Sequence, residues 1–172
     1  TKFYEGIIST GEMDENVMSM SRNEEILFFT AGNDWEMQKG YLAEKKDGIF
    51  ILPQQVSFAN PLYNGAISPS GNQIIYCVRG AEKTEIFLTK MSLDSWSDPI
   101  NLSANSDLYG GYFSWLSEEE IYFYQNENAG DIYKARLSGE KLVDVQAITE
   151  INTPANEFSP FIDPAQNFLI FT

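Results

Sequence analysis

The most regular feature of the sequence is a short apolar stretch that returns at nearly equal intervals. The stretches are LFFT, IIYC, IYFY and LIFT, which begin at Leu27, Ile74, Ile121 and Leu169 and are therefore 47, 47 and 48 residues apart. Each one follows a polar turn: SRNEE, SPSGN, LSEEE or DPAQN. Gly, Pro, Asn and Ser reverse the chain in such turns, and another short segment precedes each of them. The pattern predicts that every repeat begins with a β-hairpin.

The rest of each repeat predicts two further strands. After a polar loop, the segments EIFLTKM and DIYKARL alternate apolar with polar residues, which is the pattern of a half-buried strand, and GYLAEKK is a weaker version. A fourth segment closes each repeat, as IFILP, PINLS or VQAIT. The periodic segments are rich in Val, Ile, Phe, Tyr and Thr, which disfavours helices. Four short antiparallel strands in a repeat of about 47 residues are typical of a β-propeller blade.

The predicted fold is therefore an all-β propeller of four-stranded antiparallel blades, in a single domain or fragment of one. We expect full blades at residues 14–60, 61–107 and 108–154, a partial blade at 155–172, and a closing strand in 1–13. Either the chain is part of a longer propeller, which we favour, or the first strand joins the last half-blade to close a four-bladed ring. A β-sandwich is an alternative that does not require equal repeats.

Several motifs resemble the repeat of TolB-like, WD-repeat-like propellers of bacterial envelope proteins, and together they span essentially the whole chain. That repeat has a Ser-Pro-Asp-Gly turn, an Asp-Ile-Tyr strand start and a Trp-x-x-Pro-x-x-Leu ending. The matching residues here are Ser68-Pro69-Ser70-Gly71, Asp131-Ile132-Tyr133, Glu85-Ile86-Phe87, and Trp96, Pro99 and Leu102. The turns Ser21 to Glu24 and Leu116 to Glu119 depart from the pattern.

This resemblance implies a periplasmic, cell-surface or secreted propeller, often six-bladed, with no single activity attached. Fold alone does not carry function.

Charge and composition narrow the classes of partner. The net charge is −14, from 25 acidic and 11 basic residues, so nucleic acids and anionic membrane surfaces should be repelled. The apolar runs have strand length, so we expect no direct membrane insertion. Partners are predicted to be neutral, basic or cationic, with a protein or a carbohydrate as the leading ligands.

The sequence offers little to catalysis or to metal binding. It contains no histidine, which excludes Ser-His-Asp and Cys-His catalysis and histidine-containing zinc sites. The single cysteine, Cys77, lies in an apolar strand and is expected to be a buried thiol. No cofactor is predicted, although Asn126 to Asp131 (NENAGD) weakly resembles an oxygen-rich calcium loop.

The candidate binding residues lie in loops that a propeller places on one face. In a four-stranded blade, the loops from strand two to three and from strand four to the next blade share a face. We predict binding residues there: Asp34, Trp35, Glu36, Tyr63, Glu82, Glu85, Asp107, Tyr109, Glu127 and Asp131. Glu12, Asp14, Glu15 and Glu157 map to the same face, whereas Lys45, Lys46 and Lys141 map to the other, so charge should be asymmetric.

Some of these residues also have a structural interpretation. Glu85 and Asp131 precede strands at equivalent repeat positions, where acids often bond to backbone N–H groups, and Tyr63 and Tyr109 recur at one position and suit packing. Trp115 is expected in the core. No other repeat has equivalents of Asp34, Trp35 and Glu36, which therefore remain the stronger binding candidates.

The leading hypothesis is a non-enzymatic binding module or scaffold that uses this acidic, aromatic-bearing face. Two alternatives stay open: a carboxylate-dependent glycosidase or lyase acting on polysaccharide, and a structural or gating propeller attached to another domain. Ligand identity, blade number and oligomeric state do not follow from the sequence.

Overall fold

Alternating apolar positions and frequent turns produce a chain built from β-strands. The computed structural model describes residues 2–34, 37–80, 83–104, 106–125 and 130–172. Blade 1 contains β1 (Asp14–Met20), β2 (Ile26–Gly32), β3 (Lys39–Lys46), β4 (Ile49–Phe50) and β5 (Gln54–Gln55). Blade 2 contains β6 (Tyr63–Ile67), β7 (Gln73–Arg79), β8 (Thr84–Ser92), β9 (Ser95–Trp96) and β10 (Ile100–Asn101). Blade 3 contains β11 (Gly111–Trp115), β12 (Glu120–Gln125), β13 (Asp131–Ser138) and β14 (Lys141–Ala147), and the hairpin β15 (Phe161–Ile162) and β16 (Leu169–Ile170) follows.

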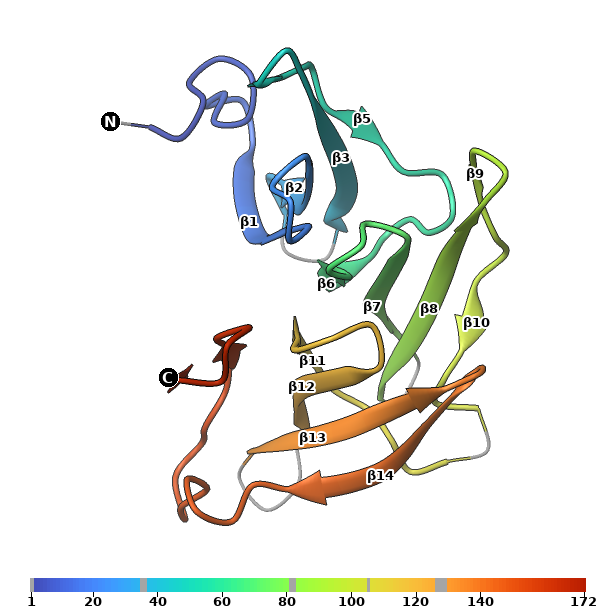
Figure 1. Cartoon of the computed structure of the whole chain (residues 1–172), viewed down its shortest axis with the longest axis vertical. Coiled ribbons are helices and arrows are strands. Elements are labelled where there is room, and N and C mark those ends of the chain that lie inside the picture. Colours follow the sequence, from blue (N-terminus) through green and yellow to red (C-terminus); the bar gives the residue numbers. More distant parts are fainter. Residues whose placement is uncertain (1, 35–36, 81–82, 105, 126–129) are drawn as a thin grey trace.

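The strands of each blade form an antiparallel sheet in chain order. The sheet orders are β1-β2-β3-β4, β6-β7-β8-β10 and β11-β12-β13-β14, with β5 also paired to β3 and β9 to β8. Figure 1 shows the three sheets following one another in an arc, with β1, β6 and β11 toward its concave side and the β15–β16 hairpin beside β11. The predicted all-β class with four-stranded antiparallel blades is confirmed, and each sheet lies inside one predicted repeat.

The inner strands β1, β6 and β11, and the segment two residues before β15, share a backbone irregularity at one repeat position. Val17, Asn64, Tyr112 and Ser159 have positive φ angles of 41°, 45°, 53° and 54°, and they are spaced by 47 or 48 residues. At the first three, the pairing register with the second strand shifts, as in a β-bulge. The backbone thus repeats where the side chains do not.

Hydrogen bonds join each inner strand to the next. The Ser19 hydroxyl donates to the Ile67 carbonyl (3.3 Å) and accepts from the Ile67 N–H (3.1 Å). The Trp115 Nε1–H donates to the Ala66 carbonyl at 3.0 Å. In the same way, the Ile162 N–H donates to the Ser114 hydroxyl at 3.1 Å and holds β15 against β11. The last hairpin therefore continues the arc.

Apolar residues fill the spaces between neighbouring blades. Between blades 1 and 2, Phe28 packs with Leu62, Ile74 and Tyr76, and a Cβ on Gly65 would lie only 2.5 Å from the Phe28 ring. A larger cluster joins blades 2 and 3 and includes Tyr63, Ile75, Cys77, Phe113, Trp115 and Phe123. Cys77 is 1% exposed and Trp115 is 7% exposed, so both are core residues as predicted.

Polar side chains connect the blades at the face that carries the β1–β2, β6–β7 and β11–β12 turns, which we call the turn face. The Arg22 guanidinium donates to the Leu116 carbonyl at 2.8 Å. The Glu118 carboxylate accepts from the Ser70 N–H (2.6 Å), the Ser70 hydroxyl (2.9 Å) and the Gln73 amide (3.2 Å). These contacts hold the first turns of three blades together.

The N-terminal segment differs from its prediction. Instead of one extended strand in 1–13, residues 2–13 form turns with a single bridge between Glu5 and Ser9. Gly6 and Gly11 have φ angles of 83° and 84°, which interrupt an extended conformation. Ile8 is nevertheless buried against Leu27, Phe29 and Phe50, so the segment covers one side of blade 1. Within the described residues, no helix is long and apolar enough to cross a membrane.

Candidate functional site

The face opposite the turn face carries the loops in which binding residues were predicted, and we call it the loop face. Six of the ten predicted binding residues lie in the described part of the chain: Asp34, Tyr63, Glu85, Asp107, Tyr109 and Asp131. Trp35, Glu36, Glu82 and Glu127 lie outside the described residues. Asp34 and Asp107 are exposed, whereas Glu85, Tyr109 and Asp131 are half-buried. A binding role for these five residues stays a prediction.

Tyr63 belongs to the core. It is 7% exposed and packs in the cluster between blades 2 and 3, opposite Cys77 in the β6–β7 pair. Gly111 pairs with Tyr124 as Tyr63 pairs with Cys77, so the residue equivalent to Tyr63 is Gly111, and the predicted recurrence of Tyr63 and Tyr109 at one position is wrong. Tyr63 is a core residue and offers little surface to a ligand.

The repeated acids Glu85 and Asp131 are not the groups that fix the following strands. The Ile86 N–H donates to the Ser103 hydroxyl at 2.8 Å, and the Ile132 N–H donates to the Asn152 Oδ1 at 2.9 Å. Glu85 instead accepts a long hydrogen bond from Asn101 at 3.4 Å. Neutral side chains from the last loop of each blade thus perform the role that the sequence suggested for the acids.

Glu157 has a structural role in the loop before β15. Its carboxylate accepts from the Thr153 N–H at 3.0 Å and from the Thr153 hydroxyl, and the residue is 6% exposed. These hydrogen bonds hold the pKa of Glu157 below its usual range. The carboxylate of this predicted loop-face acid is therefore used in hydrogen bonds within the protein.

Acidic residues are not confined to the loop face. Exposed acids also stand in the turns of the turn face, namely Glu24, Glu25, Asp47, Asp94, Glu119 and Glu140. The sequence argument placed the lysines of this face and left these acids out. The asymmetry of charge between the two faces stays a prediction.

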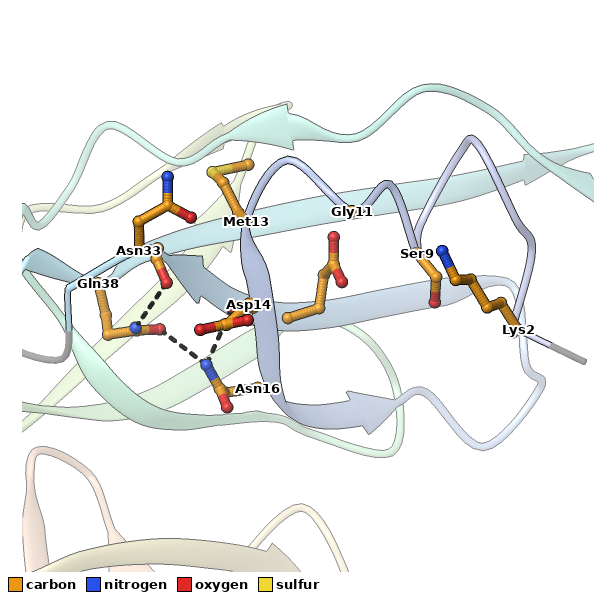
Figure 2. A pocket seen from close by; sticks show the side chains of 10 residues that line it. Lys2, Ser9, Gly11, Met13, Asp14, Asn16, Asn33 and Gln38 are labelled. Carbon is orange, nitrogen blue, oxygen red and sulfur yellow. Dashed lines mark hydrogen bonds between the residues drawn. The ribbon is translucent and has the colours of Figure 1, made fainter.

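The best-defined arrangement of acids on the loop face is a recess beside blade 1, which we call the blade 1 recess. Its volume is about 570 Å³, and Asp14, Glu15, Asn16, Asn33 and Gln38 line it with oxygen-bearing side chains. Figure 2 shows Asp14, Asn16, Asn33 and Gln38 grouped near the start of β1 and the β2–β3 loop, with Lys2 of the N-terminal segment farther along the recess.

A hydrogen-bond chain organises the floor of this recess. The buried Gln38 amide donates to the carbonyls of Gly32 and Asp34, each at 3.3 Å. The Asn16 amide donates to the Asp14 carbonyl at 2.9 Å and to Gln38 Oε1 at 3.4 Å (Figure 2). The predicted loop residue Asp34 joins this network through its backbone carbonyl and directly follows Asn33, which lines the recess.

The two carboxylates of the recess are held differently. Glu15 accepts from the Thr10 N–H (3.1 Å) and hydroxyl (2.9 Å), which ties it to the N-terminal segment. Asp14 is exposed. Lys2, which also lines the recess, lies 3.8 Å from the Glu5 carboxylate. The recess therefore presents acceptor oxygens, which suit an ammonium, a guanidinium or a hydroxyl donor.

Sequence reasoning missed the amide residues Asn16, Asn33 and Gln38. They lie at the end of strands or in a loop, and only the fold brings them together. Metal binding gains no support here, because the described residues contain no group of three or more Asp, Glu, Cys or His side chains that could hold an ion. Residues 126–129 of the suggested calcium loop lie outside the described residues.

A second, more apolar hollow follows the concave side of the arc. This groove has a volume of about 700 Å³ and is lined by the inner strands and β15, including Met18, Met20, Phe113, Trp115 and Phe161. The positive-φ residues Val17, Tyr112 and Ser159 described above also line this groove.

No family model matches the chain, and no curated protein matches it. The solved structures that are similar to this chain include two TolB proteins. TolB from Acinetobacter baumannii superposes with a TM-score of 0.67 at 10% identity, over 92% of this chain and 37% of that one. A putative TolB from Agrobacterium tumefaciens gives a TM-score of 0.64 at 15% identity, over 92% of this chain and 53% of that one.

The chain thus spans about a third to a half of the length of these two proteins. Identities this low establish the fold. The chain is therefore a TolB-like β-propeller in its fold, as its repeat motifs predicted.

Proposed function

We propose that this chain is a non-enzymatic binding propeller of the bacterial envelope, which receives a basic segment of a partner protein at the blade 1 recess. The observation that carries the proposal is the recess itself, where the Asp14 and Glu15 carboxylates stand over a floor of ordered amides. A fixed set of acceptor oxygens can bind Lys or Arg with little loss of side-chain freedom on the protein side.

Electrostatics favour this class of partner. The net charge of −14 attracts basic segments from a distance, and the exposed Asp14 gives that attraction a local target. The exposed Asp34 directly follows Asn33, which lines the recess, so it adds an acidic residue next to the recess. Charge of this kind speeds association and makes binding sensitive to salt.

The arrangement suits binding better than glycoside hydrolysis. Hydrolysis by paired carboxylates needs two acids that face each other across the scissile bond. Asp14 and Glu15 are neighbours in one strand and line the same side of one recess, and the Glu15 carboxylate is already hydrogen-bonded to Thr10. The resemblance to envelope propellers supports the same proposal and a periplasmic location.

Affinity capture from an envelope extract tests the proposal. The immobilised 172-residue chain is compared with an Asp14→Asn/Asp34→Asn variant and with an Asp94→Asn/Glu140→Gln control, which changes the same amount of charge on the turn face. We expect a protein partner that elutes from the wild type and from the control at moderate salt. The amount of this partner that the loop-face variant retains should be at least about tenfold lower.

Two results would overturn the proposal. Equal retention by all three baits would place binding away from the recess. Equal loss in the loop-face variant and the control would show that net charge, and not the recess, attracts the partner.

A further inference from the structure

A second recess on the loop face lies between blades 2 and 3, and no part of the proposed function uses it. It has a volume of about 270 Å³ and is lined by Tyr109, Tyr112, Tyr124, Asn64, Lys83 and Gly110, among others. We call it the tyrosine recess. Its size is below that of pockets for drug-sized ligands, so it suits a single ring or side chain.

The shared irregularity of the inner strands forms its inner wall. Asn64 and Tyr112 are the positive-φ residues of β6 and β11, at the position where β1 has Val17 and the segment just before β15 has Ser159. Gly110 has a φ of 152°, and a Cβ there would overlap the Tyr124 carbonyl oxygen. The chain after Tyr109 can therefore lie directly against β12, so that Tyr109, Tyr112 and Tyr124 line the same recess.

The tyrosines supply flat apolar surfaces with neutral hydroxyl groups. The Tyr112 and Tyr124 rings meet edge to face, with centroids 6.0 Å apart. Burial raises the pKa of both phenols, and Tyr112 and Tyr109 raise the pKa of Tyr124 further. Each hydroxyl therefore stays protonated at neutral pH and can both donate and accept a hydrogen bond.

Asn64 adds an unsatisfied polar group. The residue is 9% exposed and lines the recess, and its Oδ1 has no hydrogen-bond partner. A buried amide oxygen without a partner is unfavourable, so a donor that reaches it gains more than an ordinary surface contact. A side-chain hydrogen bond already joins Asn64 to Tyr112, so Oδ1 is the group that Asn64 offers to a ligand.

The charge of the recess favours a neutral ligand. The Lys83 ammonium donates to the Ser106 carbonyl at 3.0 Å and lies 5.7 Å from the centre of the Tyr109 ring, so contacts within the protein already engage it. No carboxylate stands among the described residues that line the recess. Neither a cation nor a polyanion is matched by such a lining.

We propose that the tyrosine recess binds one ring of a neutral, hydroxyl-rich sugar. Sugar hydroxyls donate and accept, so they match both the phenols and the Asn64 amide, and the C–H face of a sugar ring packs on aromatic surfaces. The blade 1 recess lacks such aromatic walls, so the two recesses suit different ligands.

Saturation-transfer NMR on the 172-residue chain tests this inference. The probes are methyl β-glucoside, methyl β-galactoside, methyl α-mannoside and N-acetylglucosamine, each at up to about 50 mM, because a ligand of one ring is expected to bind with a millimolar Kd. We expect transfer to at least one sugar, and a Kd raised about fivefold or more by Tyr109→Ala and by Tyr124→Phe.

Tyr122→Phe is the matched control, because Tyr122 lies two residues before Tyr124 on the same strand and does not line the recess. It should leave the Kd unchanged. Circular dichroism and thermal unfolding establish that each variant is folded, and Tyr124→Phe removes only a hydroxyl. Absence of transfer to every probe, or equal binding by the wild type and all folded variants, would overturn the inference.

Discussion

The inner strands and the outer strands of this propeller differ in how closely they repeat from blade to blade. The inner strands β1, β6 and β11, and the segment just before β15, share one backbone irregularity at a spacing of 47 or 48 residues, although the side chains at that position are Val, Asn, Tyr and Ser. In the described outer strands, only Asp144 of β14 has a positive φ, so those strands share no such feature. Blades 1 and 2 each close with two strands of two residues, whereas blade 3 closes with one strand of seven.

The difference follows from what each region contacts. An inner strand bonds to its own blade and to the next blade, as Ser19 does with Ile67 and Trp115 with Ala66. An outer strand pairs with one strand only, so its length and register are less constrained. The arc is therefore defined from the inside, and three experiments can test that view.

The largest change in the free energy of unfolding is expected for an inner-strand tryptophan, compared with an outer-strand tryptophan. Trp115→Ala removes a 7% exposed inner-strand side chain and its bond to Ala66, and should lower the free energy of unfolding by about 3 to 5 kcal/mol. Trp96→Ala removes a half-buried outer-strand side chain that packs on Phe58, and should cost about 1 to 2 kcal/mol. Urea unfolding monitored by circular dichroism measures both, and equal losses would contradict the comparison.

A smaller effect is expected at the turn face. Glu118→Ala removes the acceptor of three hydrogen bonds from the neighbouring blade, and should lower the free energy of unfolding by about 1 to 2 kcal/mol. Glu119→Ala, the adjacent exposed acid, should stay within about 0.5 kcal/mol of the wild type. If the two variants unfold at the same urea concentration, the bonds between turns do not stabilise the arc.

The smallest effect has the opposite sign. Val17 is a β-branched residue with a φ of 41°, a conformation that Asn adopts more readily and that Asn64 occupies in the next blade. Val17→Asn should therefore raise the free energy of unfolding by about 0.5 to 1 kcal/mol. A rise in the thermal midpoint supports a shared inner backbone, and a fall would mean that packing by Val17 outweighs its strain.

The sequence predicted the parts of the fold that depend on local pattern. The apolar stretches beginning at Leu27, Ile74 and Ile121 became β2, β7 and β12, because the second strand is buried on both sides in blades 1 and 2 and on one side in blade 3. The N-terminal turns were missed, since Gly6 and Gly11 reveal their positive φ only in the folded chain. Neither Val17 nor Tyr112 has a side chain that signals a left-handed residue.

The candidate sites were predicted less well, because they depend on which loops meet. Asp14 and Glu15 were placed on the correct face, but the amides of Asn16 and Gln38 become part of a recess only through contacts across 22 residues. The tyrosine recess joins Asn64 to Tyr112 and Tyr124 from the next blade. Assigning residues to loops predicts which face of the propeller they lie on. Predicting a recess also requires knowing how one segment packs on another.

The burial of Cys77 has a practical consequence for studying this protein. The thiol is 1% exposed, and burial raises its pKa to about 12, so at pH 8 only roughly one molecule in ten thousand carries a thiolate there. Alkylating reagents should modify this single cysteine only when the contact between blades 2 and 3 opens. The rate of alkylation would then report the opening of that contact, with no probe added to the chain.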